Sequence, residues 1–154
     1  MGIPLVVSEQ YPRGLGPTVS EIDTKKATAI IPKTRFSMVV PEVERLLQKL
    51  CDGVLESIVL FGIETHICVE QTAIELIAKN LKVHIIADAT TSRNPADRMF
   101  AFQRLRQIGC FVTTSETIIF KILGDKDHPK FGEIRHLVKE PSPNTGLVDS
   151  MAKM

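Results

Sequence analysis

Short apolar runs alternate with amphipathic segments along most of this chain. The apolar runs are bounded by glycine, proline or polar residues and predict strands at 3–7, 27–31, 57–62, 83–87 and 110–112. Helical spacing of the apolar residues, together with capping signals, predicts helices over 41–50, 65–77, 94–108, 113–123 and 129–139. This alternation predicts an α/β fold with a mostly parallel sheet.

Several polar residues follow directly after these predicted strands. Glu9 and Gln10 follow the first, Lys33 follows the second, the turn at 62–68 follows the third, and Asp88 follows the fourth. The carboxyl ends of parallel strands meet at one edge of a sheet, and ligands bind there. We therefore expect these side chains to gather at one edge.

Composition narrows the possible functions. The 154 residues include 19 basic and 18 acidic side chains, a net charge of +1, which gives no electrostatic case for binding nucleic acid or an anionic membrane. No apolar run reaches the ~20 residues that span a bilayer. Three widely spaced cysteines indicate a reducing compartment rather than a disulfide framework, and no metal-ligand spacing is visible.

Cys68 is the strongest candidate for chemistry. A helix that begins near Thr65, its expected N-cap, would hold the thiol in its first turn, where unpaired N–H groups favour the thiolate. The alternative is a buried structural cysteine. Lys33 is either a cation that favours this thiolate or a solvated surface lysine. His66 is two residues from Cys68 on the helix and is therefore a poor base for it.

Five segments together resemble the isochorismatase-like cysteine hydrolases, and in particular the animal isochorismatase domain-containing proteins. The resemblance runs from about residue 3 to residue 147. The segments that carry it are 9–16, 32–37, 62–69, 88–93 and 126–131.

This resemblance implies a three-layer α/β/α fold whose six-stranded parallel sheet has the order 3-2-1-4-5-6. It implies Cys68 as the nucleophile and Lys33 as the catalytic lysine. It further implies a cis peptide at Ile63–Glu64 and an oxyanion hole formed by the backbone N–H groups of Glu64 and Cys68. The substrate-binding candidates are Tyr11, Phe36 and Thr65, for which loop packing of the aromatics and simple capping by Thr65 are the alternatives.

One departure from the family pattern concerns the first strand and first helix. The family's aspartate, its general base, lies at the end of that strand, and no matching segment is found here. We expect an N-terminally truncated domain at 1–147, followed by a tail at 148–154. The strands at 3–7 and 57–62 would then pair directly or keep open edges. Glu9 could in principle replace the aspartate.

The sequence leads to two hypotheses for function. The first is a cysteine hydrolase acting on a small molecule, without metal or cofactor and as a homo-oligomer. The second is a catalytically impaired family member or truncated isoform with a binding or oligomerisation role. The terminal tripeptide, residues 152–154, resembles a peroxisomal signal, so the expected location is the cytoplasm or the peroxisome.

Overall fold

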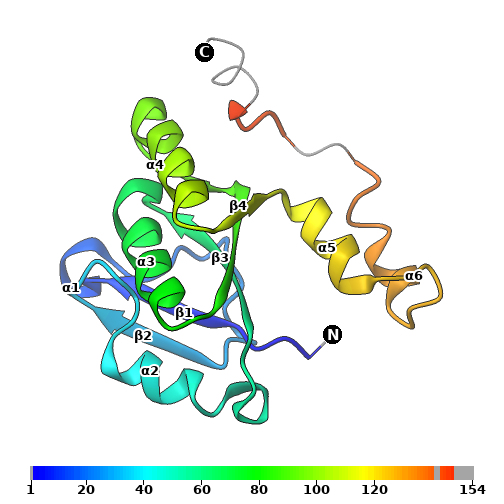
Figure 1. The fold of residues 1–154 in the computed structure, drawn as a ribbon, viewed down its shortest axis with the longest axis horizontal. Coiled ribbons are helices and arrows are strands. Elements are labelled where there is room, and N and C mark those ends of the chain that lie inside the picture. Colours follow the sequence, from blue (N-terminus) through cyan, green and yellow to red (C-terminus); the bar gives the residue numbers. More distant parts are fainter. Residues whose placement is uncertain (1, 141–142, 148–154) are drawn as a thin grey trace.

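The computed structural model describes residues 2–140 and 143–147 and contains two parallel sheets (Figure 1). The smaller sheet pairs β1 with β2, and the larger sheet has the order β3-β4-β5. The α/β class and the parallel pairing are confirmed. The strands are β1 (Val6–Gln10), β2 (Ala29–Lys33), β3 (Ser57–Ile63), β4 (Lys82–Thr91) and β5 (Phe111–Thr113).

Helices connect these strands, and most lie where the apolar periodicity predicts them. Figure 1 shows α3 and α4 side by side against the larger sheet, while α5 and α6 extend away from both sheets. The helical elements are α1 (Pro12–Leu15), α2 (Pro41–Leu47), the 3-10 turn η1 (Leu50–Gly53), the π-helical turn η2 (Thr65–Val69), α3 (Glu70–Ala78), α4 (Pro95–Gln107), α5 (Ser115–Leu123) and α6 (Phe131–Ile134).

The starts of the helices follow local chemistry. Asn94 caps α4 as predicted, because its side chain accepts a hydrogen bond of 2.9 Å from the backbone N–H of Ala96. The predicted start of α5 at residue 113 is wrong, because the helix is Ser115–Leu123. Thr113 is still paired in β5, so Thr114 is the N-cap and accepts from the backbone N–H of Thr117.

The last predicted helix, at 129–139, is also shorter than expected. Only Phe131–Ile134 is α-helical, and the backbone N–H of Leu137 then bonds back three residues to the carbonyl of Ile134. That i→i+3 bond tightens the chain into a turn and ends the helix.

The main core lies between the larger sheet and the helices α3 and α4. Its buried members from β3 and β4 include Leu60, Val83 and Ile85, and those from the helices are Ala73, Leu76, Phe102 and Leu105. A second, smaller cluster joins β2 to α2 through Ile31, Val40 and Val43. The two sheets therefore have separate cores on their helical sides.

The two sheets do not join into one. In the part of the chain that the structure describes, one edge of β1 and one edge of β3 have no strand paired to them. Of the two arrangements expected from the sequence, direct pairing or open edges, the structure therefore has open edges. Alternate residues of β3 also leave apolar side chains in solvent. Val59, Phe61 and Ile63 are 36%, 53% and 67% exposed.

Candidate active site

Cys68 and Lys33 lie together although 35 residues separate them. Lys33 is the last residue of β2, and Cys68 lies in η2, directly after β3. The Lys33 Nζ is 3.7 Å from the Cys68 Sγ. The carboxyl ends of β2 and β3 thus bring a thiol and an ammonium group into contact, as the strand-end argument predicts.

The Lys33 ammonium is held tightly. It donates to the side-chain oxygen of Gln10 at 2.6 Å, to the carbonyl of Phe36 at 2.8 Å and to the carbonyl of Arg35 at 3.0 Å. The whole residue is only 6% exposed, which excludes the solvated surface lysine considered from the sequence. Burial lowers the pKa of the Lys33 ammonium, and the neighbouring Cys68 sulfur opposes that shift.

The turn before Cys68 has the backbone geometry that the family resemblance implies. The Ile63–Glu64 peptide is cis. Glu64 is the N-cap residue of η2 with φ −84° and ψ 140°, so the expected N-cap at Thr65 is wrong. Thr65 is already inside the helical turn, fully buried, and its hydroxyl has no hydrogen-bond partner. The helical turn therefore begins one residue earlier than the polar pattern suggests.

A threonine links the cysteine turn to the loop after β2. The Thr72 hydroxyl donates to the carbonyl of Cys68 at 2.6 Å and accepts from the backbone N–H of Met38 at 2.9 Å. Arg35 also reaches α3, where it pairs with Glu75 at 2.7 Å. These contacts fix the loop that supplies two of the Lys33 acceptors against the helix that follows Cys68.

His66 is engaged on the other side of the turn. Its Nδ1 is 2.9 Å from the Ser92 hydroxyl, and its Nε2 is 4.0 Å from the Asp97 carboxylate. The Glu64 carboxylate accepts from the backbone N–H of Arg93 at 2.8 Å. This cluster attaches the turn to the end of β4, a link that sequence reasoning missed because it depends on a tertiary contact.

Tyr11 and Lys33 border an open groove of about 550 Å³, whose lining also includes Arg13, Arg35 and Glu42. Tyr11 is 52% exposed, with its ring over Gly14. Phe36 is 51% exposed and is outside the lining of this groove, while Thr65 is buried. Among the three substrate-binding candidates, only Tyr11 therefore lines the groove beside Lys33.

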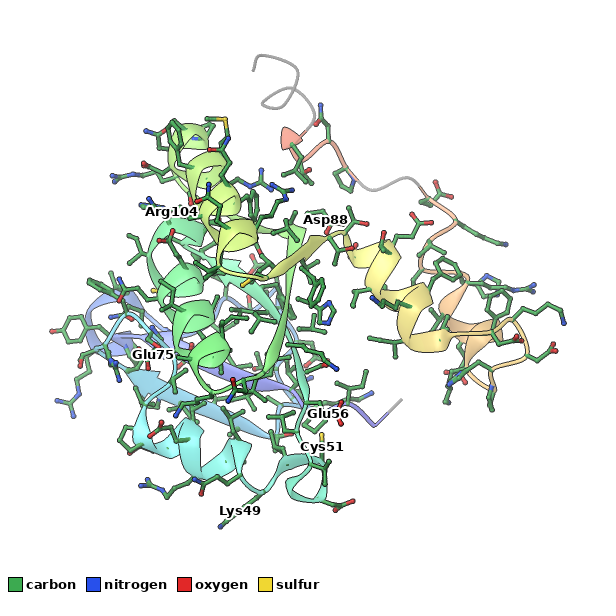
Figure 2. The ribbon with its side chains drawn as sticks, viewed as in Figure 1. Lys49, Cys51, Glu56, Glu75, Asp88 and Arg104 are labelled. Carbon is green, nitrogen blue, oxygen red and sulfur yellow. The ribbon has the colours of Figure 1, made fainter. Side chains whose placement is uncertain are left out.

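Two acidic residues expected at the same edge have other partners. Asp88 accepts hydrogen bonds from the backbone N–H and hydroxyl of Ser115, at 2.8 and 2.5 Å, and so holds the start of α5. Asp88 lies within β4, and Figure 2 shows it beside the start of α5. The Glu9 carboxylate accepts from the backbone N–H and hydroxyl of Thr18, which lowers the pKa of Glu9. Glu9 therefore holds a loop and is not bonded to Cys68.

The other two thiols occupy different settings. Cys51 is exposed on the 3-10 turn η1, and Figure 2 shows it near Glu56 at the end of the molecule opposite Arg104. Cys110 is buried, and burial raises the pKa of its thiol to about 11. Among the described residues, no cation lies within hydrogen-bonding distance of the Cys51 sulfur or of the Cys110 sulfur.

Comparison with known proteins places this chain in a family. Residues 1–117 match the isochorismatase domain, so the chain belongs to the isochorismatase-like hydrolase family. It is 52% identical over 151 residues to the isochorismatase domain-containing protein 1 of Danio rerio, covering 98% of this chain and 53% of that protein. It is 50% identical over 149 residues to the isochorismatase domain-containing protein 2 of Xenopus laevis, covering 95% and 70%.

Solved structures agree with this assignment. A structure titled as the MAR1 ribonuclease of Caenorhabditis elegans superposes with a TM-score of 0.87 at 44% identity, covering 94% of this chain and 74% of that one. A nicotinamidase from Bacillus subtilis superposes with a TM-score of 0.52 at 27% identity, covering 58% of this chain and 48% of that one. The chain spans only about half the length of the first curated relative, 53%.

Two further observations concern partners. Within residues 2–140 and 143–147, no group of three or more His, Cys, Asp or Glu side chains is placed to hold a metal ion. No helix in the same part of the chain is long and apolar enough to cross a membrane. The tripeptide at 152–154, on which the peroxisomal prediction depends, lies outside the described residues, as does the whole of the predicted tail at 148–154.

Proposed function

We propose that the protein is a cysteine hydrolase in which Cys68 is the nucleophile and Lys33 stabilises its thiolate. The observation that supports this most strongly is the 3.7 Å approach of a buried, fully hydrogen-bonded ammonium to the cysteine sulfur. A cation at that distance favours a thiolate, which is the reactive form of cysteine. Cys51 and Cys110 have no comparable setting.

The proposed reaction is hydrolysis of an amide-like bond in two steps. The thiol gives its proton to solvent, and the thiolate sulfur attacks the carbonyl carbon. The backbone N–H groups of Glu64 and Cys68 would stabilise the oxyanion, each donor contributing about 3 kcal/mol. The carbon–nitrogen bond breaks, the amine takes a proton from water, and a thioester remains. Water then hydrolyses the thioester and regenerates the thiolate.

The substrate we propose is a small molecule bound at the strand ends, with the groove beside Tyr11 as its entrance. The similar structure from Caenorhabditis elegans is described as a ribonuclease. For this chain the net charge of +1 offers no electrostatic attraction to a polyanion, which favours the small-molecule reading. Assembly of the domain as a homo-oligomer, in the cytoplasm or the peroxisome, is part of the same proposal.

A second candidate is a binding or assembly role without turnover, in a truncated form of the domain. The observation in its favour is the pair of open strand edges on β1 and β3, with Phe61 and Ile63 exposed. Open edges and apolar patches are surfaces that pair with other chains. In this reading Cys68 has no dedicated base, since no carboxylate among the described residues is hydrogen-bonded to its sulfur.

A hydrolysis screen tests the first candidate against the second. Small amides and vinyl ethers are incubated with the wild type, with Cys68→Ala and with Cys51→Ala, which is the matched control. A short RNA is tested as a further substrate with the same three proteins. Turnover that is abolished by Cys68→Ala and kept by Cys51→Ala supports the hydrolase. Turnover that survives Cys68→Ala would contradict it, and cleavage of RNA alone would overturn the proposed substrate class.

A further inference from the structure

Gln10 makes a contact that the proposed mechanism does not use. It is the last residue of β1 and pairs in register with Lys33, the last residue of β2. Its side-chain oxygen accepts from the Lys33 ammonium at 2.6 Å, the shortest hydrogen bond that this ammonium makes. The other two oxygen acceptors are backbone carbonyls. Gln10 is therefore the residue whose side chain, rather than backbone, supplies an oxygen acceptor to the Lys33 ammonium.

The orientation of the Gln10 amide is fixed at both ends. Its Nε2 donates to the carbonyl of Thr34 at 2.7 Å while its oxygen faces the ammonium. Turning the amide over would place its NH₂ group against the ammonium and its oxygen against a carbonyl, so both hydrogen bonds would be lost. The chain offers only one favourable orientation, with the acceptor toward Lys33.

Three oxygen acceptors and the Cys68 sulfur surround the ammonium and fix its position. An ammonium group has three donors and no acceptor, and Gln10, Arg35 and Phe36 each supply one oxygen. The Cys68 sulfur is then the fourth neighbour, at 3.7 Å. The Arg35 guanidinium is turned away to Glu75, so it does not compete for the sulfur.

All three oxygens belong to neutral groups, which affects the charge at the site. A carboxylate in place of Gln10 would hold the ammonium equally well but would compensate its positive charge. A neutral amide leaves that charge available to the sulfur. We propose that Gln10 is a positioning residue that holds the Lys33 ammonium beside Cys68 without neutralising it. This inference rests on the proposed role of the Cys68–Lys33 pair.

The test is the pH dependence of Cys68 alkylation by iodoacetamide, followed by mass spectrometry of the Cys68 peptide. Gln10→Glu keeps the length of the side chain and its acceptor oxygen but adds a negative charge. We expect the alkylation midpoint to move up by about one pH unit, which is roughly a tenfold loss of rate below the midpoint. The matched control is Gln107→Glu, the same change on the exposed last turn of α4.

The outcomes separate this inference from the proposed function. A folded Gln10→Glu protein with the wild-type midpoint would overturn the positioning role. If Lys33→Met nevertheless moves the midpoint, the Cys68–Lys33 pair stands and only the inference on Gln10 fails. If Lys33→Met also leaves it unchanged, the proposed pair fails as well.

A second variant keeps the test decisive if Gln10→Glu does not fold. Gln10→Met has a similar volume but offers no oxygen acceptor, so it frees the ammonium to turn away from the sulfur. We expect an upward shift of the midpoint here too, by about half a pH unit or more. An unchanged midpoint in Gln10→Met would overturn the role of the Gln10 oxygen.

Discussion

Replacing Lys33 by methionine should make Cys68 much less reactive at neutral pH. The change keeps an unbranched apolar stem and removes the charge that lies 3.7 Å from the sulfur. At an effective dielectric constant of ~20, two unit charges at this separation attract by about 4 kcal/mol. This is an upper bound equal to about three pH units, because a shift of one unit corresponds to about 1.4 kcal/mol.

The expected shift is smaller than that bound. Cys68 is only half-buried, so solvent screens part of the attraction between the Lys33 ammonium and the sulfur. We expect the alkylation midpoint of Cys68 to rise by about one to two pH units. The rate at pH 7 would then fall roughly 10- to 100-fold.

This change is measured by quenching iodoacetamide alkylation at set times between pH 5 and pH 10. Mass spectrometry of the Cys68 peptide then gives the alkylation rate at each pH. Lys82→Met is the control, since it removes a lysine that is exposed at the start of β4 and pairs with Glu56 at 3.7 Å. Circular dichroism establishes that each variant is folded. A folded Lys33→Met protein whose profile matches the wild type would refute the claim that Lys33 supports the Cys68 thiolate.

Three further predictions concern stability. Cys110 has a raised pKa, so the native state keeps a proton that the unfolded state loses above pH 9; we expect about 1 kcal/mol of stability to be lost between pH 8 and pH 10 in urea unfolding, and Cys110→Ala to remove this contribution to the slope. Thr72→Val should lower the free energy of unfolding by about 1–3 kcal/mol, because it leaves the backbone N–H of Met38 without its hydrogen-bond acceptor. Thr90→Val should lower it by less, because the buried Thr90 hydroxyl has no partner to lose. Equal losses in the two variants would contradict these contacts. A strand–helix segment from a longer relative, fused before residue 1, should raise the melting temperature by at least about 5 °C by pairing the open edges of β1 and β3, and no gain would mean that these edges are already satisfied.

Much of the fold could be predicted from the sequence because its signals are local. Apolar runs predicted the presence of all five strands, and Asn94 followed by proline predicted the start of α4. Two of the predicted strand ends are wrong, because β1 is Val6–Gln10 and so includes Glu9, and β4 continues to Thr91 and so includes Asp88. The error at the start of α5 arises because strand pairing and helix capping compete for the same residue. Thr113 remains in the ladder of β5, which leaves the cap of α5 to Thr114. Strand pairing and capping use the same backbone groups, and the sequence pattern alone does not show which of them wins.

The site was predictable only in part. The position of Cys68 after a strand and the family resemblance indicated both Cys68 and Lys33, and the structure places them in contact. Gln10 was expected at the same edge, but its role depends on a register pairing and on the orientation of one amide. Asp88 was expected there too, yet its carboxylate binds Ser115 at the start of α5. The partner of such a side chain depends on tertiary contacts, which the periodic pattern of a sequence does not show.

Competition among the three cysteines for an alkylating reagent tests whether Cys68 is the activated thiol. Wild-type protein is treated with a limiting amount of iodoacetamide at pH 7, and labelling of each cysteine peptide is followed in time. We expect Cys68 to be labelled well before the exposed Cys51, and the buried Cys110 to be labelled last. Labelling of Cys51 as fast as Cys68, or faster, would contradict it.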